Sequence, residues 1–374
     1  MVGDSESKIK VVQLSSAHPS FDTRIFYKIC TSLVKAGYQV DLVIQHEKNE
    51  VKNGVNIIAL PKAEKKSDRV FKIIPRLLLK ALKYPRNTVI HFHDPELIPI
   101  GIILKLTGKK VIYDVHEDVP KDILGKEWIP QIFRVLISKA MKLLERFSLL
   151  LFDNIIVVTS EIEKRFKSSK TILLQNFPII NTNSDITLGN DITDPTYIFY
   201  LGDITIIRGL REVIKALEIV NKKRKVTLIL GGKFSPNSLE GVLKNEPGWK
   251  YVDFIGWINR KRMEEVASKC SMGIVTFHPV PNHIEAQPNK LFEYMYLGLP
   301  VIASNFPLWK EIIQDAGILV NPLDPQEIAD SILWFTENPV ERKKMGERGR
   351  CLVLEKYNWE EEEKKLINLY KELV

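Results

Sequence analysis

The chain has 374 residues, of which 45% are hydrophobic and 27% are charged, with a formal net charge of +8. This composition excludes a disordered or fibrous protein, and the length is sufficient for two domains, each with its own core. The basic excess lies in residues 1–184, which hold 29 Lys and Arg against 19 Asp and Glu, so the two halves of the chain are expected to face different partners.

The cysteines and the apolar runs bear on the cellular compartment. Cys30, Cys270 and Cys351 are far apart and match no metal-site spacing, which indicates a reduced intracellular protein without disulfides. The first residues lack the basic and apolar regions of a secretory signal. The longest apolar run, "LLLFDNIIVV", is interrupted by Asp153 and Asn154 and is too short to span a membrane. We therefore expect a cytoplasmic protein.

The first half of the chain alternates strand-like and helical patterns. The strand-like runs are 9–16, 39–45, 54–60, 88–94, 109–117, 154–160 and 171–177. Helical patterns, such as the one at 22–37, lie between many of them. Apolar strands separated by helices are typical of a parallel sheet that is covered on both faces, so we expect an α/β domain.

Residues 62–86 form the most basic segment. Its apolar residues recur at helical spacing, which predicts a helix with one apolar and one basic face. These apolar positions are Val70, Ile73, Ile74, Leu77, Leu78 and Ala81. Pro75 predicts that the helix kinks or restarts there. The alternatives are a solvated helix packed on its own domain, a helix docked on an anionic membrane, and a nucleic-acid contact, which no base-reading motif supports. We expect no nucleic-acid partner.

A polar stretch at 178–196 interrupts the alternation, and we place a domain boundary within it, between 184 and 185. The alternation then restarts and predicts a second α/β domain over 185–374. Its strand-like runs are 197–203, 225–232, 251–257, 272–277, 300–304 and 317–321, and its helical patterns begin near 208, 260 and 288. Residues 358–374 read as an amphipathic helix, which we expect to pack back on the N-terminal domain.

Ligands of open parallel sheets bind outside the carboxyl ends of the strands. Polar, Gly and Pro residues follow the predicted strands in both halves of the chain. We therefore expect two Rossmann-like domains with a binding cleft between them.

The segment with the clearest chemistry is a helix expected over 288–297. Pro288 suits the first helical position, and Gly298 suits the stop. The free N–H groups near the helix start, the helix dipole and the charge of Lys290 would together bind a phosphate or a diphosphate. The residues whose N–H groups are expected to be free are Asn289, Lys290 and Leu291.

Two carboxylates flank this helix start. Glu293, one turn into the helix, could accept hydrogen bonds from the vicinal hydroxyls of a ribose, and Glu285, in the preceding loop, would meet whatever lies beyond the phosphates. This arrangement predicts a nucleotide sugar across the helix start. The alternative is a first-turn acid that stabilises the helix dipole, beside an unrelated loop charge.

The spacing from Glu285 to Glu293, with "PNKLFEYMYLGLPVIAS", resembles the signature of the retaining GT-B glycosyltransferases of family 4, the large group 1 family. The blocks "HPSFDTRIFYKICTSLVKAGYQVDLV", "HFHDPELIPIGIILKLTGKKVIYDVHED", "YLGDITIIRGL", "VDFIGW" and "SNFPLWKEII" resemble members thought to build surface polysaccharides. The resemblance spans nearly the whole chain. It implies two Rossmann-like domains that face each other across a cleft, and retaining transfer of a sugar from a nucleotide-diphosphate sugar to a glycan or lipid-linked acceptor.

The resemblance also assigns roles. It implies that Glu293 binds the ribose, that Glu285 contacts the donor sugar, and that His116 lies beside the anomeric carbon. For His116, the alternative is a loop histidine bound by Asp114 or Glu117. The loops expected to bind and select the donor hold Gly202, Gly232, Lys233, Gly256 and Trp257. Weaker acceptor-side candidates, for which a structural His-Asp pairing is the alternative, are His18, Asp22, Arg24, His93 and Asp94.

One loop departs from the family's pattern of Gly-Arg followed by Lys-Gly. In "GDITIIRG", Asp203 replaces the arginine and Arg208 replaces the lysine. Arg208 can make a forked contact with phosphate, whereas Asp203 cannot, so diphosphate binding rests on Arg208, Lys290 and the helix start. No Asp-x-Asp arrangement indicates a metal site. We expect neither a metal nor a cofactor besides the nucleotide-sugar co-substrate, with a UDP-sugar favoured over a GDP-sugar.

The mechanism that the resemblance implies is retention, with the leaving diphosphate assisting attack on the same face. The expected catalytic residues are His116, Glu285, Arg208 and Lys290. Two alternatives stay open: a nucleotide-sugar-binding scaffold without activity, because of Asp203, and a GT-B sugar-nucleotide epimerase. A Rossmann dehydrogenase and a P-loop enzyme are disfavoured, because the chain has neither G-x-G-x-x-G after its first strand nor G-x4-G-K-[ST]. The basic first half suggests work at the inner face of the membrane.

Overall fold

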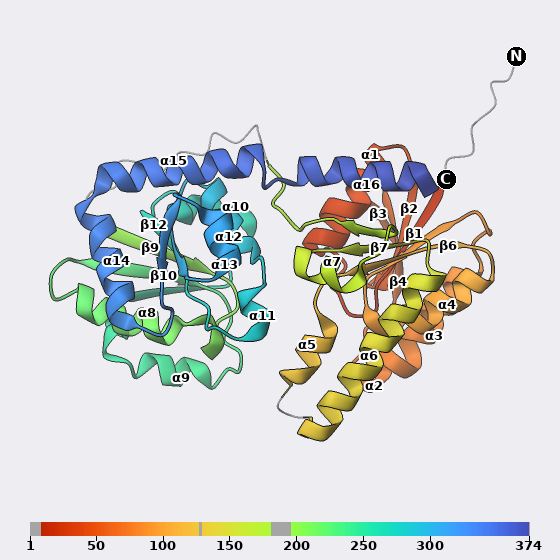
Figure 1. Ribbon diagram of the computed structural model, residues 1–374, viewed down its shortest axis with the longest axis horizontal. Coiled ribbons are helices and arrows are strands. Elements are labelled where there is room, and N and C mark those ends of the chain that lie inside the picture. The colour runs from red at the N-terminus through yellow and green to blue at the C-terminus, as the bar shows by residue number, and fades with distance from the viewer. Residues whose placement is uncertain (1–8, 127–128, 181–195, 374) are drawn as a thin grey trace, which may run out of the picture. The chain divides into compact units, whose positions relative to one another are not determined.

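The computed structural model describes residues 9–126, 129–180 and 196–373. The chain divides into two compact units (Figure 1). The first unit joins Met1–Asn176 to the final segment Trp359–Val374, and the second unit is Phe177–Asn358. The boundary predicted between 184 and 185 lies outside the described residues.

The first unit is built on an eight-stranded sheet in the order β3-β4-β2-β1-β5-β6-β7-β8. The strands are β1 (Lys10–Leu14), β2 (Gln39–Gln45), β3 (Glu50–Lys52), β4 (Val55–Leu60), β5 (Val89–Phe92), β6 (Lys110–Val115), β7 (Asn154–Val157) and β8 (Thr171–Leu173). All neighbouring strands are parallel except β3 and β4. Each of the seven strand-like runs in this half contains one of these strands, so the predicted parallel sheet is confirmed.

The antiparallel strand β3 is an addition to the predicted strands. Asn53 and Gly54 join β3 to β4, and both have positive φ, 51° and 77°. This is the geometry of a type I′ turn, in which an Asn-Gly pair is strongly favoured. The Asn-Gly pair was therefore a hairpin signal, although the three-residue strand before it is too short and polar to be recognised by periodicity.

Helices cover both faces of this sheet (Figure 1). On one face lie η1 (Thr23–Cys30), α1 (Thr31–Lys35) and α16 (Trp359–Leu373), and on the other lie α3 (Ile74–Leu82), α4 (Ile98–Leu106) and α6 (Gln131–Leu151). The shorter helices are α2 (Lys66–Asp68), η2 (Arg69–Ile73), η3 (Pro95–Leu97), α5 (Val119–Leu124) and α7 (Ser160–Phe166). The helical pattern at 22–37 thus forms η1 and α1, and the Asp22 side chain caps η1 by accepting hydrogen bonds from the amides of Arg24 and Ile25.

The final helix, α16, belongs to the core of the first unit. Trp359 Nε1 donates to Ser32 Oγ over 3.0 Å, and the Glu362 carboxylate accepts from the Gln175 amide over 2.8 Å. Tyr370 is fully buried. The last segment of the chain is therefore structurally part of the N-terminal unit.

The basic segment forms α2, η2 and α3. Pro75 lies in the first turn of α3, so the predicted restart of the helix is confirmed. Ile73, Leu77 and Ala81 are buried, as expected for an inward apolar face. Val70, assigned to the same face, is exposed because the π-helical turn η2 shifts its angular position.

The second unit holds a six-stranded, fully parallel sheet in the order β11-β10-β9-β12-β13-β14. The strands are β9 (Thr196–Leu201), β10 (Val226–Gly231), β11 (Val252–Gly256), β12 (Met272–Val275), β13 (Val301–Ser304) and β14 (Gly317–Val320). Successive residues of β9 enter different cores: Ile198 and Tyr200 pack into one, and Phe199 packs into the other. The sheet is therefore buried on both faces, as its continuous apolar strands predict.

One core of the second unit receives α8 (Leu210–Val220), α9 (Leu239–Lys244) and α14 (Pro325–Glu337). The other core receives α10 (Arg260–Ala267), α12 (Asn289–Tyr296), α13 (Pro307–Ile313) and α15 (Pro339–Glu355). The short helices η4 (Ile206–Arg208), η5 (Pro247–Tyr251) and α11 (Pro281–Ile284) lie between strands and helices.

The close packing of α12 on β12 depends on Gly273. A Cβ atom at this position would lie 2.4 Å from the ring of the buried Tyr294. We expect Gly273→Ala to destabilise the protein by roughly 1–3 kcal/mol, because the overpacked ring must shift. Urea denaturation measures the change. Gly241→Ala is the matched control, because its Cβ would meet open space on the exposed face of α9 and should stabilise by about 0.5–1 kcal/mol. Equal stabilities for the two variants would contradict this account.

Candidate functional site

The start of α12 carries a buried, unpartnered cation. The Lys290 ammonium is buried, and no hydrogen-bond partner for it exists in the described parts of the chain. It lies 3.7 Å from the centre of the Tyr200 ring. Burial and the neighbouring charge of Arg208 hold the pKa of Lys290 well below its ordinary value, although Glu293 and Asp203 act in the opposite direction. A buried ammonium without an acceptor is costly, so this position is suited to an anion.

Gly202 lies between this lysine and a second cation. A Cβ atom on Gly202 would lie 2.9 Å from Lys290 Nζ and 3.6 Å from Arg208 Nη1. A side chain at 202 would therefore occupy the space beside both cations. A Cβ on Gly232 would lie 1.9 Å from the carbonyl oxygen of Gly202, so the loops after β9 and β10 touch through their glycines. The predicted donor-loop residues Gly202 and Gly232 are thus brought to the two predicted cations.

Asp203 pairs with one of these cations. Arg208 Nη1 donates to the carbonyl oxygen of Asp203 over 3.0 Å, and Arg208 Nη2 lies 3.5 Å from the Asp203 carboxylate. Asp203 is 69% exposed, so this ion pair is largely screened by water and contributes little to stability. The carboxylate nevertheless neutralises part of the charge that Arg208 would offer to an anion.

The helix start differs in detail from the prediction. Pro288 precedes α12 as its N-cap, with extended backbone, instead of being its first helical residue. The Leu291 amide donates to the Pro288 carbonyl over 3.0 Å. The N–H group of Leu291 is therefore used within the helix start in this structure, and its contact with the donor stays a prediction. The backbone amides of Asn289 and Lys290 are the other candidates for binding a diphosphate.

The two acids lie on either side of this helix start. Glu285 follows α11, and Glu293 lies one turn into α12, and both side chains are half-buried. The loop that carries Glu285 is anchored, because Trp309 Nε1 donates to the Ala286 carbonyl over 2.7 Å and His278 Nε2 lies 3.0 Å from the Glu212 carboxylate. A fixed loop can hold a carboxylate at a defined place beside the cations.

The remaining predicted donor residues lie at the ends of β10 and β11. Lys233 and Trp257 are exposed, and Gly256 has a positive φ of 68°. The Gly232 amide donates to the Gly256 carbonyl over 2.8 Å, which links these two loops.

Sequence patterns missed two residues that shape the site. The Tyr200 ring lies against the Lys290 ammonium, and the Tyr294 hydroxyl accepts a hydrogen bond from the Leu201 amide over 2.8 Å. From the sequence pattern, Tyr200 is an ordinary core residue of a strand, and Tyr294 is an ordinary core residue of a helix. No sequence signal distinguishes them, because their roles depend on which elements pack together.

In the first unit, the predicted histidines converge on Asp114 at the end of β6. This fully buried carboxylate accepts from Arg24 Nε over 2.9 Å and from Arg24 Nη2 over 2.8 Å. The Nε2 atom of His116 lies 3.1 Å from it, and Nδ1 of His93 lies 3.3 Å from it. Burial alone would raise the pKa of Asp114, but the charge of Arg24 and the bonds from His116 and His93 hold it well below its usual value.

His93 is enclosed within this cluster. Its Nε2 atom lies 2.8 Å from Gln13 Oε1, and its Nδ1 atom lies 3.1 Å from His116 Nε2. Burial lowers the pKa of His93 to about 4, against the opposing effect of Asp114. Burial likewise lowers the pKa of His91, whose Nδ1 lies 2.8 Å from the Tyr370 hydroxyl. Both imidazoles are therefore neutral at pH 7.

His116 and His18 form the more accessible side of this cluster. Both are half-buried, and their ring centres are 4.9 Å apart. Asp114 binds His116, as the structural alternative predicts, and this bond orients the ring. Burial tends to lower the pKa of His18, but the nearby carboxylates of Asp22 and Asp94 outweigh it and raise this pKa.

The other acceptor-side candidates are bonded within the protein. Arg24 is bonded to Asp114 and to the Leu174 carbonyl, and the Asp22 carboxylate caps η1. Asp94 accepts from the Ser15 hydroxyl and the Ser16 amide and is buried, as is His93. These side chains are held by the protein's own groups around His18 and His116. Their role on the acceptor side stays a prediction.

One group of side chains in the described parts of the chain could in principle hold a metal ion. Ligand atoms of His91, His93 and Asp114 lie within 4.8 Å of one another. However, Arg24 binds both oxygens of Asp114, and a divalent ion there would be repelled by the guanidinium. We retain metal independence as a prediction.

Comparison with known proteins identifies the two halves. Residues 23–172 match the family model Glycosyltransferase Family 4, and residues 189–351 match the family model Glycosyl transferases group 1. An uncharacterized glycosyltransferase of Methanocaldococcus jannaschii is 25% identical over 185 residues, which cover 48% of this chain and 45% of that protein. The chain spans about half the length of the curated relatives that it matches.

Solved structures show the fold. The sucrose-phosphate synthase of Thermosynechococcus elongatus is 18% identical with a TM-score of 0.74, covering 98% of this chain and 99% of that chain. Anabaena HepE in complex with UDP-glucose is 14% identical with a TM-score of 0.70, covering 97% of this chain and 100% of that chain. These likenesses, with the two parallel-sheet units, show the predicted GT-B fold.

The neutral, buried His93 predicts a pH-dependent stability. Its pKa is about 4 when folded and about 6.5 when unfolded, so between pH 7 and 5 only the unfolded state gains the proton. The free energy of unfolding should fall by about 2 kcal/mol over this range from His93, with His91 adding in the same direction. Urea denaturation at the two pH values measures the fall, and His93→Gln should reduce it.

His18 supplies a control of opposite sign. Its raised pKa adds stability as the pH falls, so His18→Gln should make the loss between pH 7 and 5 steeper. A loss of stability that is the same in the wild type and both variants would show that these imidazoles do not titrate as described.

Proposed function

Because the chain belongs to the GT-B glycosyltransferases, we propose that it transfers a sugar from a nucleotide-diphosphate sugar to a glycan or lipid-linked acceptor with retention of anomeric configuration. The observation that carries this proposal is the buried Lys290 ammonium, which has no hydrogen-bond partner among the described residues and lies beside Arg208. Two adjacent cations at a helix start match the charge of a diphosphate.

The donor is proposed to bind along the loops of the second unit. Lys290, Arg208 and the amide of Asn289 would contact the diphosphate, and the glycines at 202 and 232 leave room for it. Glu293 is assigned to the ribose, and Glu285 to the sugar. A UDP-sugar is favoured over a GDP-sugar, because the similar HepE structure holds UDP-glucose.

The chemistry is proposed to rest on charge stabilisation. As the glycosidic bond to the diphosphate breaks, negative charge grows on the leaving oxygens, and Lys290 and Arg208 would stabilise it. The leaving diphosphate would assist attack on the same face of the sugar, so that no protein nucleophile is needed. His116, oriented by Asp114, is the proposed catalytic histidine of the first unit.

The class of acceptor and the cellular site of the reaction are proposed from the charge of the first half of the chain and from the sequence blocks that resemble the family. A role in surface polysaccharide or glycolipid synthesis fits the motif blocks, and the basic segment 62–86 is a proposed contact with an anionic membrane at the inner face. Lys72 in this segment is paired with Asp68 at 2.7 Å, so its available charge is smaller than the sequence indicates.

Donor binding can be tested without knowing the acceptor. We expect saturating UDP to raise the melting temperature of the wild type, by an increment corresponding to about 2.7 kcal/mol at a hundredfold excess over the dissociation constant. Lys290→Met should remove this shift without lowering the melting temperature of the free protein, because an apolar side chain replaces a buried charge. Arg208→Ala should also remove it, and Asp203→Asn should enlarge it by freeing Arg208.

Exposed Lys222→Ala is the control and should respond to UDP like the wild type. An unchanged UDP shift in Lys290→Met would refute the diphosphate assignment. The same measurement with UDP-, GDP-, ADP- and dTDP-sugars identifies the base.

Measuring turnover distinguishes a glycosyltransferase from the two alternatives, a scaffold without activity and an epimerase. Glu285→Ala and Arg208→Ala should each lower the transfer rate by roughly a hundredfold or more while the fold is kept, because they remove contacts made at the reacting sugar and diphosphate. NMR of the product reports both the rate and the anomer, and an inverted anomer would contradict retention. Wild-type rates in both variants would reject the site. Donor binding without transfer to any acceptor favours a scaffold, and an altered sugar from the donor alone favours an epimerase.

A further inference from the structure

Helix α6 carries its apolar side chains on the outside. Ile132, Leu143 and Leu150 are 77%, 70% and 74% exposed. The other large apolar side chains exposed on this helix are Phe133, Val135, Leu136, Ile137 and Phe147. A helix on the surface of a globular protein normally shows the reverse arrangement. The concentration of apolar surface on one helix therefore requires an explanation.

The three buried residues of α6 are polar. Ser138 Oγ donates to the Pro120 carbonyl over 2.8 Å, and the buried Glu145 is paired with Arg165. The third buried residue, Ser148, donates to the Glu145 carbonyl over 2.7 Å. Met141, Leu144, Leu149 and Leu151 also pack against the core of the first unit, so the helix is attached through both apolar and polar groups. The exposed leucines on its outer side are not part of this attachment.

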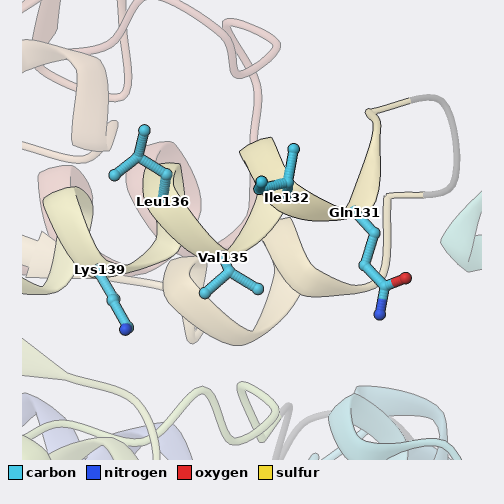
Figure 2. A pocket seen from close by; sticks show the side chains of 5 residues that line it. All are labelled: Gln131, Ile132, Val135, Leu136 and Lys139. Atoms are coloured by element: carbon cyan, nitrogen blue, oxygen red, sulfur yellow. The ribbon is translucent and has the colours of Figure 1, made fainter.

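Figure 2 shows the first turns of α6, where an open hollow is lined by five side chains. Ile132 and Leu136 project from one side of the helix, and Val135 and Lys139 project from the other. Apolar groups therefore face outward over more than one side of this end of the helix.

The charges on α6 indicate which kind of partner covers its exposed apolar side chains. Its basic residues are Arg134, Lys139, Lys142 and Arg146, and its single acid, Glu145, is buried and paired. A second copy of the chain would bring these cations against their equivalents, which like charges disfavour. An anionic lipid surface offers acyl chains to the apolar groups and phosphates to the cations.

The neighbouring helices extend this surface. In one helical layer, α4 packs on α6 and α3 packs on α4 (Figure 1). Leu106 at the end of α4 and Phe71 before α3 are each 78% exposed. Exposed apolar side chains are therefore also present on the helices that neighbour α6.

We propose that α6 lies in the surface of an anionic bilayer, with its outer apolar side chains among the acyl chains and its cations at the lipid phosphates. No helix in the described parts of the chain combines the length and the apolarity that crossing a membrane requires. The helix therefore lies along the membrane surface. The contact made by α6 is distinct from the basic charges of segment 62–86, and it does not depend on glycosyl transfer.

Flotation of the full-length protein with vesicles tests the proposal. Wild type should bind vesicles that contain phosphatidylglycerol and phosphatidylcholine, and should bind pure phosphatidylcholine weakly. The variant Leu136→Gln/Leu143→Gln/Leu150→Gln removes one stripe at seven-residue spacing, and its partition coefficient should fall roughly tenfold or more. The control is Val340→Gln/Leu354→Gln, which removes exposed apolar groups from the second unit and should bind like the wild type.

A second readout reports insertion. An environment-sensitive dye on Leu143→Cys, in a Cys351→Ser background, should shift its emission to the blue on phosphatidylglycerol vesicles. The variant with Lys72, Arg76 and Lys80 changed to Gln should keep this shift at the vesicle concentration that saturates it. Circular dichroism and the UDP-induced melting shift should be unchanged in the triple-Gln variant, which separates this proposal from donor binding.

Several results would overturn the proposal. They are absence of wild-type binding, equal binding by the triple-Gln variant, and equal binding to pure phosphatidylcholine. A wild-type dimer that the triple-Gln variant converts to a monomer, without vesicle binding, would assign α6 to a second copy instead.

Discussion

Parallel strand pairing brings the chemistry of each unit to one edge of its sheet. The carboxyl ends of neighbouring parallel strands lie side by side, so residues far apart in sequence meet there. In the first unit this pairing brings Asp94, which follows β5, close to Asp114, which lies near the end of β6. In the second unit it joins Gly202 and Gly232, whose backbones touch. Without continuous apolar strands that are buried on both faces, neither cluster would form.

The two clusters treat buried charge in opposite ways. Arg24 and Asp114 neutralise each other with two short hydrogen bonds, and the buried imidazoles of His91 and His93 are neutral. Lys290 is also buried but has no acceptor in the described parts of the chain, and the charge that most affects its pKa is that of Arg208, another cation. The charges of Arg24 and Asp114 in the first cluster are balanced within the protein. The second has an excess of positive charge that a diphosphate would remove, which is the electrostatic basis for proposing a donor site there.

Two features of the chain are not required for folding. They are the charge of Asp203 and the exposed apolar side chains of α6. Asp203 is exposed and weakens the positive field of Arg208, which a chain selected for donor affinity alone would avoid. The outer leucines of α6 lower solubility without packing into a core. Such departures from consistent folding are expected at functional positions, where binding to another molecule offsets their cost.

The sequence by itself determined the order and type of most elements, because apolar periodicity and the Pro and Gly positions are local signals. It also located Lys290, Glu285 and Glu293 through their spacing around one helix start. It did not reveal that Arg24, His93 and Asp94 are buried, that the Leu291 amide is used within its own turn, or that Tyr200 faces Lys290. Only the tertiary structure decided these points, because hydrogen-bond partners and burial depend on which strands and helices pack together, and no local pattern records that.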